Sequence, residues 1–360
     1  MTSIVLIGND HGGAVLLSCM LDEMLKHYDL RALASGPAYD LWKRSAITIE
    51  DIGVNDLKAR LKYLQPDLIV TGTSHYSELE RSSWIAAQDL NIPSLAVIDA
   101  WVNFPERFTR LSDNTLIRPD AFTAIDQHTE TQIRDLLGDQ VRSYVTGHPH
   151  LEGIVIRHHN RSQKPRGNTP PKVMFFSNPV HAVGYEVGSY RNQFDAIEML
   201  FEACASSKEK LVLGIKPHPR EPHDQWQAWA QRHKNAFAQG WVRFEDAASE
   251  DLIENSDIVA GITSMALVEG VLMNKSVLSI QLSRHVQTNP ILDAIDGLRI
   301  ADNESQVAEQ LEITLKTLDK VDSSVNTLST ALINSSDRLL NAIRREVQFE
   351  HSMPFSGQSL

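Results

Sequence analysis

"DIVAGITSMALVEGVLMNKSVLSI", residues 257–280, is the stretch that decides the fold class of this chain. An apolar, β-branched run over 257–264 predicts a strand, the segment 265–274 predicts a helix, and a second apolar run starts at Ser276. Strands that are apolar on both faces are typical of a parallel sheet covered by helices. The stretch therefore predicts one strand–helix–strand unit of an α/β protein.

The same alternation continues on both sides of this unit. Before residue 157, apolar runs predict strands at 3–8, 28–35, 66–74, 93–101, 121–126 and 143–149. Beyond residue 171, they predict strands at 172–179, 210–219 and 241–246. Helix-like segments lie between these runs, the first of them at 13–27, and a terminal helical stretch extends from about Ser305 to Val347.

A polar, basic segment rich in proline and glycine, "RHHNRSQKPRGNTPP", interrupts the pattern at 157–171 and predicts a linker. We therefore expect a Rossmann-like N-terminal domain at 1–156, a second Rossmann-like domain at 172–347 and a loose tail at 348–360. The predicted fold class is α/β, with two βαβ domains facing a cleft and a C-terminal helical segment. In such sheets, ligands bind beyond the carboxyl ends of the strands.

Composition excludes several classes of protein. The net charge of -12 argues against a general nucleic-acid binder, which needs a basic surface. No apolar run approaches the roughly 20 residues that span a bilayer, and the N-terminus lacks the basic start of a signal peptide. We expect Cys19 and Cys204 to be buried, reduced thiols, which fits a cytoplasmic protein.

The most unusual strand end is "LVLGIKPHPREPHD", residues 211–224. Its prolines stiffen the turn and keep the next helix from starting early. The turn displays three basic donors, Lys216, His218 and Arg220. Such donors suit a phosphate oxyanion. The alternative is a stiff strand exit whose charges are solvated.

A second candidate phosphate element lies in the opening stretch. There the strand delivers Gly261, Thr263 and Ser264 to a helix N-terminus, where free N–H groups and the helix dipole favour an anion. Glu269, inside that helix, is placed to accept hydrogen bonds from ribose hydroxyls. An ordinary capped helix with a solvent-facing Glu is the alternative. Together, the two elements describe a site for a nucleotide monophosphate or diphosphate.

Polar residues also follow the strands of the N-terminal half. Asp10 and His11 lie in "GNDHGG" (8–13), where the alternative to a functional role is a helix cap beside an exposed His. The strand at 66–74 ends in the small hydroxyl residues Thr73 and Ser74, and the acids Glu78 and Glu80 follow it. Asp99 lies at the end of the next strand. It is either a functional acid or a helix cap or partner of Arg107.

A strand ending in "KPHP", a small-hydroxyl turn and a helix with a Glu resemble glycosyltransferases of the GT-B fold. The resemblance is nearest to CDP-glycerol glycerophosphotransferases and bacterial sialyl- and polysialyltransferases. Their HP and Ser/Thr motifs bind the phosphate of a cytidine nucleotide, and they match His218-Pro219 and Thr263-Ser264 here. "SMALVEG" also resembles the ribose-binding helix of UDP-sugar transferases, which assigns that role to Glu269. Two departures leave the donor nucleotide and the base open: "GITS" replaces an Asp-Tyr-Ser-Ser run, and the acidic motif of sialyltransferases is not evident.

The resemblance implies inverting, metal-independent transfer from a CMP-, CDP- or UDP-linked sugar to a cell-surface glycan or lipid-linked acceptor. No cofactor beyond the donor is implied. The N-terminal domain would bind the acceptor, with Thr73, Ser74 and Glu78 on that side. His11 is the favoured base because its pKa lies near neutrality, and Asp99 would orient its imidazole. The rival bases are Asp10, Glu78 and Glu80.

Two other functions stay open at this point. An enzyme like UDP-N-acetylglucosamine 2-epimerase shares the fold and needs several acids near the sugar, although the Ser-Gly-Gly turn of those enzymes is missing here. A non-catalytic chain would bind a nucleotide or a partner without turnover. The histidines show no zinc-like spacing, so we expect no metal site. Peripheral membrane association and a homodimer are also left open.

Overall fold

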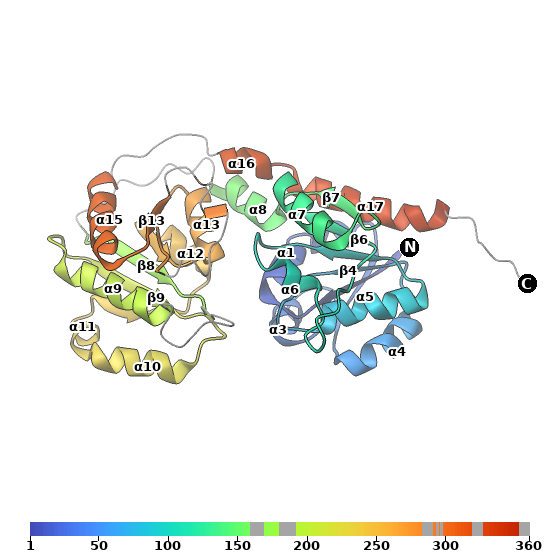
Figure 1. Cartoon of the computed structure of the whole chain (residues 1–360), viewed down its shortest axis with the longest axis horizontal. Helices are drawn as coiled ribbons and strands as arrows, with labels where there is room; N and C mark the ends of the chain where they lie inside the picture. The colour runs from blue at the N-terminus through green and yellow to red at the C-terminus, as the bar shows by residue number, and fades with distance from the viewer. Residues whose placement is uncertain are drawn as a thin grey trace, which may run out of the picture. The chain divides into compact units, whose positions relative to one another are not determined.

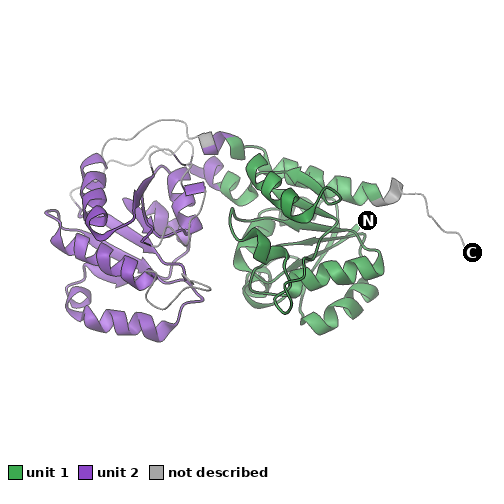
Figure 2. Ribbon diagram, in the orientation of Figure 1, with its two compact units in different colours: residues 1–153, 331–360 green, residues 154–330 purple. Residues whose placement is uncertain are grey.

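The computed structural model describes residues 1–158, 169–179, 192–282, 291–292, 295, 298–318 and 327–352. The chain folds into two units, which Figure 2 colours separately. Unit 1 holds residues 1–153 and 331–360, and unit 2 holds residues 154–330. No helix within the described parts of the chain is both long enough and apolar enough to cross a bilayer.

Unit 1 is built on a parallel sheet in the order β3-β2-β1-β4-β5-β6-β7. Its strands are β1 Ser3–Gly8, β2 Asp29–Ala34, β3 Thr48–Asp51, β4 Leu68–Thr71, β5 Ser94–Val97, β6 Ala121–Ala124 and β7 Arg142–Val145. Its helices are α1 His11–Ser18, α2 Leu21–Met24, α3 Gly36–Trp42, α4 Val54–Leu64, α5 Leu79–Leu90, α6 Phe104–Phe108 and α7 Gln127–Leu137. The six predicted strands are confirmed, whereas the edge strand β3, with its polar sequence "TIED", escaped the apolar pattern.

Unit 2 repeats this plan with a parallel sheet in the order β10-β9-β8-β11-β12-β13. The strands are β8 Lys172–Phe176, β9 Val212–Lys216, β10 Val242–Phe244, β11 Ile258–Gly261, β12 Ser276–Ile280 and β13 Arg299–Ala301. The helices are α9 Gln193–Ser206, α10 His223–Arg232, α11 Lys234–Ala238, α12 Ser249–Glu254, α13 Met265–Leu272 and α15 Glu304–Thr317. Two further helices, α8 Pro149–His158 and α16 Thr327–Leu332, cross the unit boundaries. The predicted pair of parallel α/β sheets is confirmed.

In each sheet the strand order reverses beside the first strand of the unit. The chain moves outward from β1 to β3 and then returns to β4, and likewise from β8 to β10 and back to β11. The loops that follow the two strands at such a reversal diverge to opposite faces of the sheet and leave a crevice. The physical expectation is therefore a ligand at the carboxyl ends of β1 and β4, and another at those of β8 and β11.

The C-terminal helix α17 (Ser335–Ser352) belongs to unit 1, contrary to the predicted domain at 172–347. Figure 1 shows this red helix along the sheet that the first half of the chain forms. Leu339 and Ile343 join the apolar core of β1 and β4. The buried Glu346 accepts hydrogen bonds from Arg142 and from the hydroxyl of Tyr144. The amphipathic pattern predicted a helix, but such a pattern does not say which sheet the helix covers.

Two local predictions also change. The helix predicted at 13–27 is two helices, α1 and α2, with a break at Cys19 and Met20. Cys19 is exposed at the end of α1, whereas Cys204 is buried as predicted, and burial raises the pKa of its thiol to about 12. Most of the predicted linker at 157–171 lies outside the described residues, as does the end of the predicted tail.

Candidate functional site

The predicted basic turn of unit 2 follows β9 at the carboxyl edge of the sheet. The Nζ of Lys216 donates to the carbonyl oxygen of Ala247 at 2.5 Å. Burial lowers the pKa of this lysine, and the charge of Asp246 opposes the shift. The Nδ1 of His218 accepts a hydrogen bond from the backbone N–H of Arg220 at 3.1 Å. The three predicted donors therefore share one short turn with a defined backbone.

A carboxylate that the sequence did not single out, Glu221, fixes this turn. It is 8% exposed. One of its oxygens accepts a hydrogen bond from the Oγ of Ser177 at 2.6 Å. The other accepts from the backbone N–H of His218 at 2.8 Å and from the indole N–H of Trp226 at 2.9 Å. Glu221 thus joins the loop after β8, the turn after β9 and helix α10. An acid in the run Arg-Glu-Pro looks like a solvated surface charge in the sequence, so its burial was not foreseen.

The second predicted phosphate element follows β11 and contacts the same loop after β8. The side-chain amide of Asn178 donates to the Oγ1 of Thr263 at 3.3 Å, and its oxygen accepts from the Thr263 N–H at 3.3 Å. Asn178 directly follows Ser177, the residue that donates to Glu221. The structure therefore brings the two predicted phosphate elements together, one on each side of the loop after β8.

Helix α13 begins at this point with the features that the sequence predicted. The Oγ of Ser264 accepts from the N–H of Ala266 at 3.3 Å and caps the helix. Gly261 lies against β8, where an added Cβ would sit 2.8 Å from the carbonyl oxygen of Phe176. Glu269 is half-buried on the helix. The first N–H groups of such a helix, together with its dipole, stabilise an anion.

In unit 1, the turn after β1 contacts the loop after β5. The Asp10 carboxylate accepts from the N–H of His11 at 2.9 Å and caps α1, and His11 is exposed. At Gly12 an added Cβ would lie 2.0 Å from the Oδ2 of Asp99, so a larger residue does not fit there. The structure therefore brings the start of α1, directly after Asp10 and His11, close to Asp99.

Asp99 forms the ion pair with Arg107 that the sequence offered as one of its two roles. The Nη1 of Arg107 lies 2.6 Å from the Oδ1 of Asp99, and both side chains are buried. The same Nη1 donates to the Oγ1 of Thr73 at 2.6 Å. The Nε2 of His148 contacts the backbone oxygen of Asp99 at 3.0 Å. Thr73 and Asp99 thus share one buried cation, which orders the loops after β4 and β5.

Arg81, a fully buried residue that the sequence did not single out, holds the predicted acceptor-side loop. Its guanidinium donates to the carbonyl oxygen of Ser74 at 2.6 Å and to the carboxylate of Glu78 at 3.2 Å. Glu78 also accepts from the N–H of Leu111 at 2.5 Å. Ser74 and Glu78 are therefore structural members of this loop, whatever ligand the loop contacts.

Two titratable groups behind these loops have shifted pKa values. Burial raises the pKa of Glu80 to about 7, although the N–H of Asn9 donates to one of its oxygens at 2.7 Å and stabilises the ionised form. The other oxygen of Glu80 is buried and has no hydrogen-bond partner among the residues that the structure describes. Burial lowers the pKa of His148 to about 4, and the charge of nearby His150 adds to this. His148 is therefore a neutral imidazole at pH 7.

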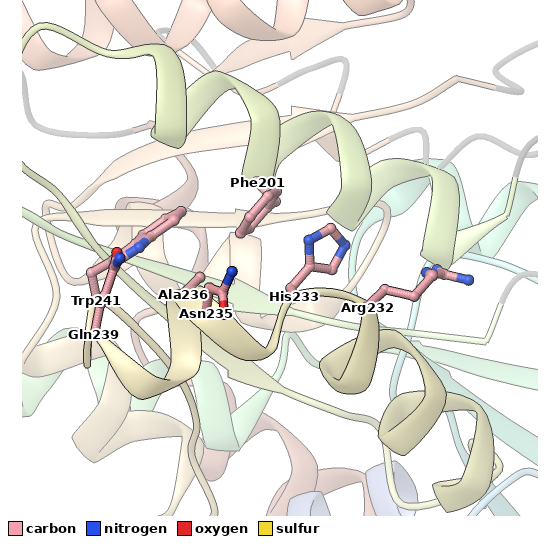
Figure 3. A pocket seen from close by; sticks show the side chains of 7 residues that line it. All are labelled: Phe201, Arg232, His233, Asn235, Ala236, Gln239 and Trp241. Carbon is pink, nitrogen blue, oxygen red and sulfur yellow. The ribbon is translucent and has the colours of Figure 1, made fainter.

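Other candidate sites lie apart from these loops. Among the described residues, no group of three or more His, Cys, Asp or Glu side chains is placed to share a metal ion. Figure 3 shows a pocket of about 270 Å³ in unit 2. There Phe201 packs between His233 and Trp241, with ring centroids 4.1 Å and 5.1 Å away. Trp241 directly precedes β10, so the pocket lies at the amino end of that strand, and none of the predicted site residues lines it.

No protein-family model matches this sequence, and no curated protein sequence matches it either. Solved structures do match. UDP-GlcNAc 2-epimerase from Methanocaldococcus jannaschii, in complex with UDP-GlcNAc and UDP, aligns over 96% of this chain and 100% of its own, with a TM-score of 0.68 and 11% identity. UDP-N-acetylglucosamine 2-epimerase from Rickettsia bellii aligns over 99% and 100%, with a TM-score of 0.69 and 14% identity. A glycosyltransferase from Rickettsia africae aligns over 98% and 99%, with a TM-score of 0.62 and 12% identity.

The chain has a GT-B-like fold. The matches span nearly the whole length of both chains, and each unit has the parallel sheet that a Rossmann-like domain requires. At identities of 11% to 14% the likeness shows the fold alone. The narrower resemblance to CDP-glycerol glycerophosphotransferases and sialyltransferases is not confirmed by these structures.

Proposed function

We propose that this chain is an enzyme that acts on a nucleotide sugar, with unit 2 binding the nucleotide phosphates. One observation carries the proposal: Ser177 and Asn178 link the His218 turn to the Thr263 turn at the strand-order reversal of unit 2. A GT-B-like fold alone does not identify a ligand. Basic donors and a capped helix N-terminus on the two sides of one loop favour an anion with several oxygens, such as a diphosphate.

For the reaction, we favour inverting glycosyl transfer from a CMP-, CDP- or UDP-linked donor. His11 would accept the proton of an acceptor hydroxyl as its oxygen attacks the anomeric carbon, with Asp10 as the rival base. The bond from that carbon to the phosphate oxygen breaks, and the nucleotide leaves. Lys216, His218 and the N-terminus of α13 would stabilise the leaving phosphate, so the step needs no metal or cofactor.

The acceptor, the location in the cell and the partners of the protein stay predictions from the sequence. They comprise a glycan or lipid-linked acceptor at the cell surface, a cytoplasmic location, contact with a membrane and a homodimer. The roles of Glu269 in binding ribose, and of Thr73, Ser74 and Glu78 in binding the acceptor, are proposals of the same kind. Arg81 and Arg107 already engage the acceptor-side residues, so we expect those residues to shape the site through the loops they order.

A UDP-N-acetylglucosamine 2-epimerase is the second candidate, and the fold comparisons favour it because several of the matching structures are such epimerases. Elimination and re-addition at the sugar need accessible acids and bases. In unit 1, however, Asp99 is paired with Arg107, Glu78 with Arg81, and Glu80 is buried against Asn9. These contacts leave fewer accessible carboxylates for a sugar to contact, and we therefore place transfer first.

Calorimetry with UDP, CDP and CMP tests the proposal. We expect one of them to bind, and the variants His218→Ala and Ser264→Ala to weaken its affinity about tenfold or more. His223→Ala, an exposed His on α10, is the matched control. If none of the three nucleotides binds the folded protein, the proposal is wrong. Incubation with UDP-GlcNAc then separates the two candidates: formation of the 2-epimer without an acceptor supports the epimerase, whereas acceptor-dependent release of UDP supports the transferase.

A further inference from the structure

The buried carboxylate of Glu221 lies at the centre of the proposed nucleotide site, yet its hydrogen bonds go to other residues of the protein. Its two oxygens accept three hydrogen bonds, from Ser177, His218 and Trp226, on three different elements. A buried carboxylate with three donors is well satisfied, and it is a poor direct ligand for a phosphate because like charges repel. Its placement suggests that it acts on the ligand through the residues it holds.

The nearest consequence concerns the proton on His218. Glu221 fixes the backbone N–H of His218, and the turn that results brings the N–H of Arg220 to the ring Nδ1. A ring nitrogen that accepts a hydrogen bond carries no proton, so neutral His218 has its proton on Nε2. The imidazole is therefore preset as a donor, which is the form that a phosphate oxygen requires.

A second consequence concerns the link across the loop after β8. Glu221 holds Ser177, and the next residue, Asn178, makes two hydrogen bonds to Thr263. A displacement of the His218 turn would therefore be transmitted to the N-terminus of α13 through two adjacent residues. Groups that belong to one hydrogen-bond network respond to mutation non-additively.

We propose that Glu221 is a positioning residue that presets His218 as an Nε2 donor and, through Ser177 and Asn178, couples it to Thr263 so that both turns hold one diphosphate. The coupling rests on the proposed nucleotide site. The preset form of His218 does not, because the contacts that define it are present without a ligand.

Three variants separate the geometry of Glu221 from its charge. In Glu221→Gln the amide oxygen can still accept from His218 and Trp226, and the amide N–H can donate to Ser177, so we expect UDP or CDP affinity within about threefold of wild type. Glu221→Ala removes all three contacts and should lower affinity at least about tenfold. Ser177→Ala removes only the contact to Glu221 and is the variant least disturbing to the fold. In its background, the losses of nucleotide affinity caused by His218→Ala and Thr263→Ala should become additive.

The control is Glu198→Gln. Glu198 also accepts an indole N–H from α10, that of Trp229, and it contacts His233, which lines the pocket of Figure 3. We expect it to leave nucleotide affinity unchanged. If Glu221→Ala and Ser177→Ala bind nucleotide like wild type while His218→Ala does not, the coupling is wrong.

Nitrogen NMR of the free protein tests the tautomer without any nucleotide. We expect His218 to be the Nε2–H form in wild type and Glu221→Gln, and a mixture of tautomers in Glu221→Ala. The same mixture in all three proteins would overturn the positioning role. This readout needs no ligand. If the protein binds no nucleotide, the proposed function is refuted, but the tautomer of His218 in the three proteins still decides whether Glu221 is a positioning residue.

Discussion

Unit 1 and unit 2 differ in how deeply they bury the arginine and lysine residues near the carboxyl ends of their strands. Around β1, β4 and β5, the charges of Arg81, Arg107 and Asp99 are almost fully buried and neutralise one another or bind carbonyl groups. Around β9, Lys216 and His218 are half-buried and Arg220 is exposed. The same order of the central strands thus supports buried, internally paired cations in one unit and partly exposed donors in the other.

The difference indicates how each unit meets a ligand. Buried pairs stabilise the loops that carry them only while both partners are present, so their loss affects the fold first. Half-buried donors remain able to bind an anion, so their loss affects affinity first. Changes in unit 1 should therefore lower stability, and changes in the turn of unit 2 should lower nucleotide binding.

The largest expected effect is that of Arg107→Met in unit 1. It leaves Asp99 buried without its cation and should lower the free energy of local unfolding by about 3–5 kcal/mol. Hydrogen exchange of the amides of β4 and β5 measures this quantity. Arg110→Met is the control, because Arg110 and Asp113 form an exposed pair, which contributes little to stability. Equal losses in the two variants would show that burial of the pair has no such role.

The next effect concerns Glu80 and pH. Its pKa is near 7 in the folded protein against an ordinary value of 4.5, so the folded state binds more protons between these values. The free energy of unfolding should therefore fall as pH rises from 4.5 through 7, by about 3 kcal/mol in total. Glu80→Gln should remove this decline and be more stable than wild type at pH 8.

Chemical unfolding across this pH range checks the Glu80 prediction. Glu78→Gln is its control, since it removes a carboxylate two residues away and keeps Glu80 itself. Parallel pH profiles for wild type and Glu80→Gln would show that Glu80 is ionised in the folded protein at neutral pH, and that unit 1 tolerates the buried charge.

A smaller effect, and one of a different kind, is expected from Lys216→Met in unit 2. It should lower UDP or CDP affinity about tenfold, because a charge-assisted contact to phosphate is lost, while stability changes little. Calorimetry measures the affinity. The control is Lys210→Met, an exposed lysine just before the other end of β9. If Lys216→Met lowers the free energy of unfolding more than the free energy of nucleotide binding, the role of Lys216 is structural, like that of the buried charges of unit 1.

The smallest expected effect on stability is that of Ser264→Ala. It removes the cap of α13 and should lower the free energy of local unfolding by about 1 kcal/mol. Hydrogen exchange of α13 measures this. Ser249→Ala is the control, since Ser249 begins α12 without capping it and should have a smaller effect. If Ser264→Ala changes neither stability nor nucleotide binding, the N-terminus of α13 is not the anion site of unit 2.

The sequence by itself determined the apolar strands, their succession and the polar residues that follow them, whereas the short edge strands β3 and β13 were missed. Apolar runs such as "SIVLIG" and "DIVAGITS" suffice for this, because strand formation and capping depend on neighbours within a few residues. The topology of alternating strands and helices then limits the fold to a parallel sheet. His218, Thr263 and Ser264 were found in this way, and the structure brings their two turns to the same loop.

The tertiary structure alone decided which partners those residues have. Glu221 looked like a surface charge until the loop after β8 placed Ser177 against it. The helix α17 returned to unit 1, where Glu346 meets Arg142 from 204 residues away along the chain. Burial and pairing depend on such distant contacts, and a local pattern of residue types carries no information about them.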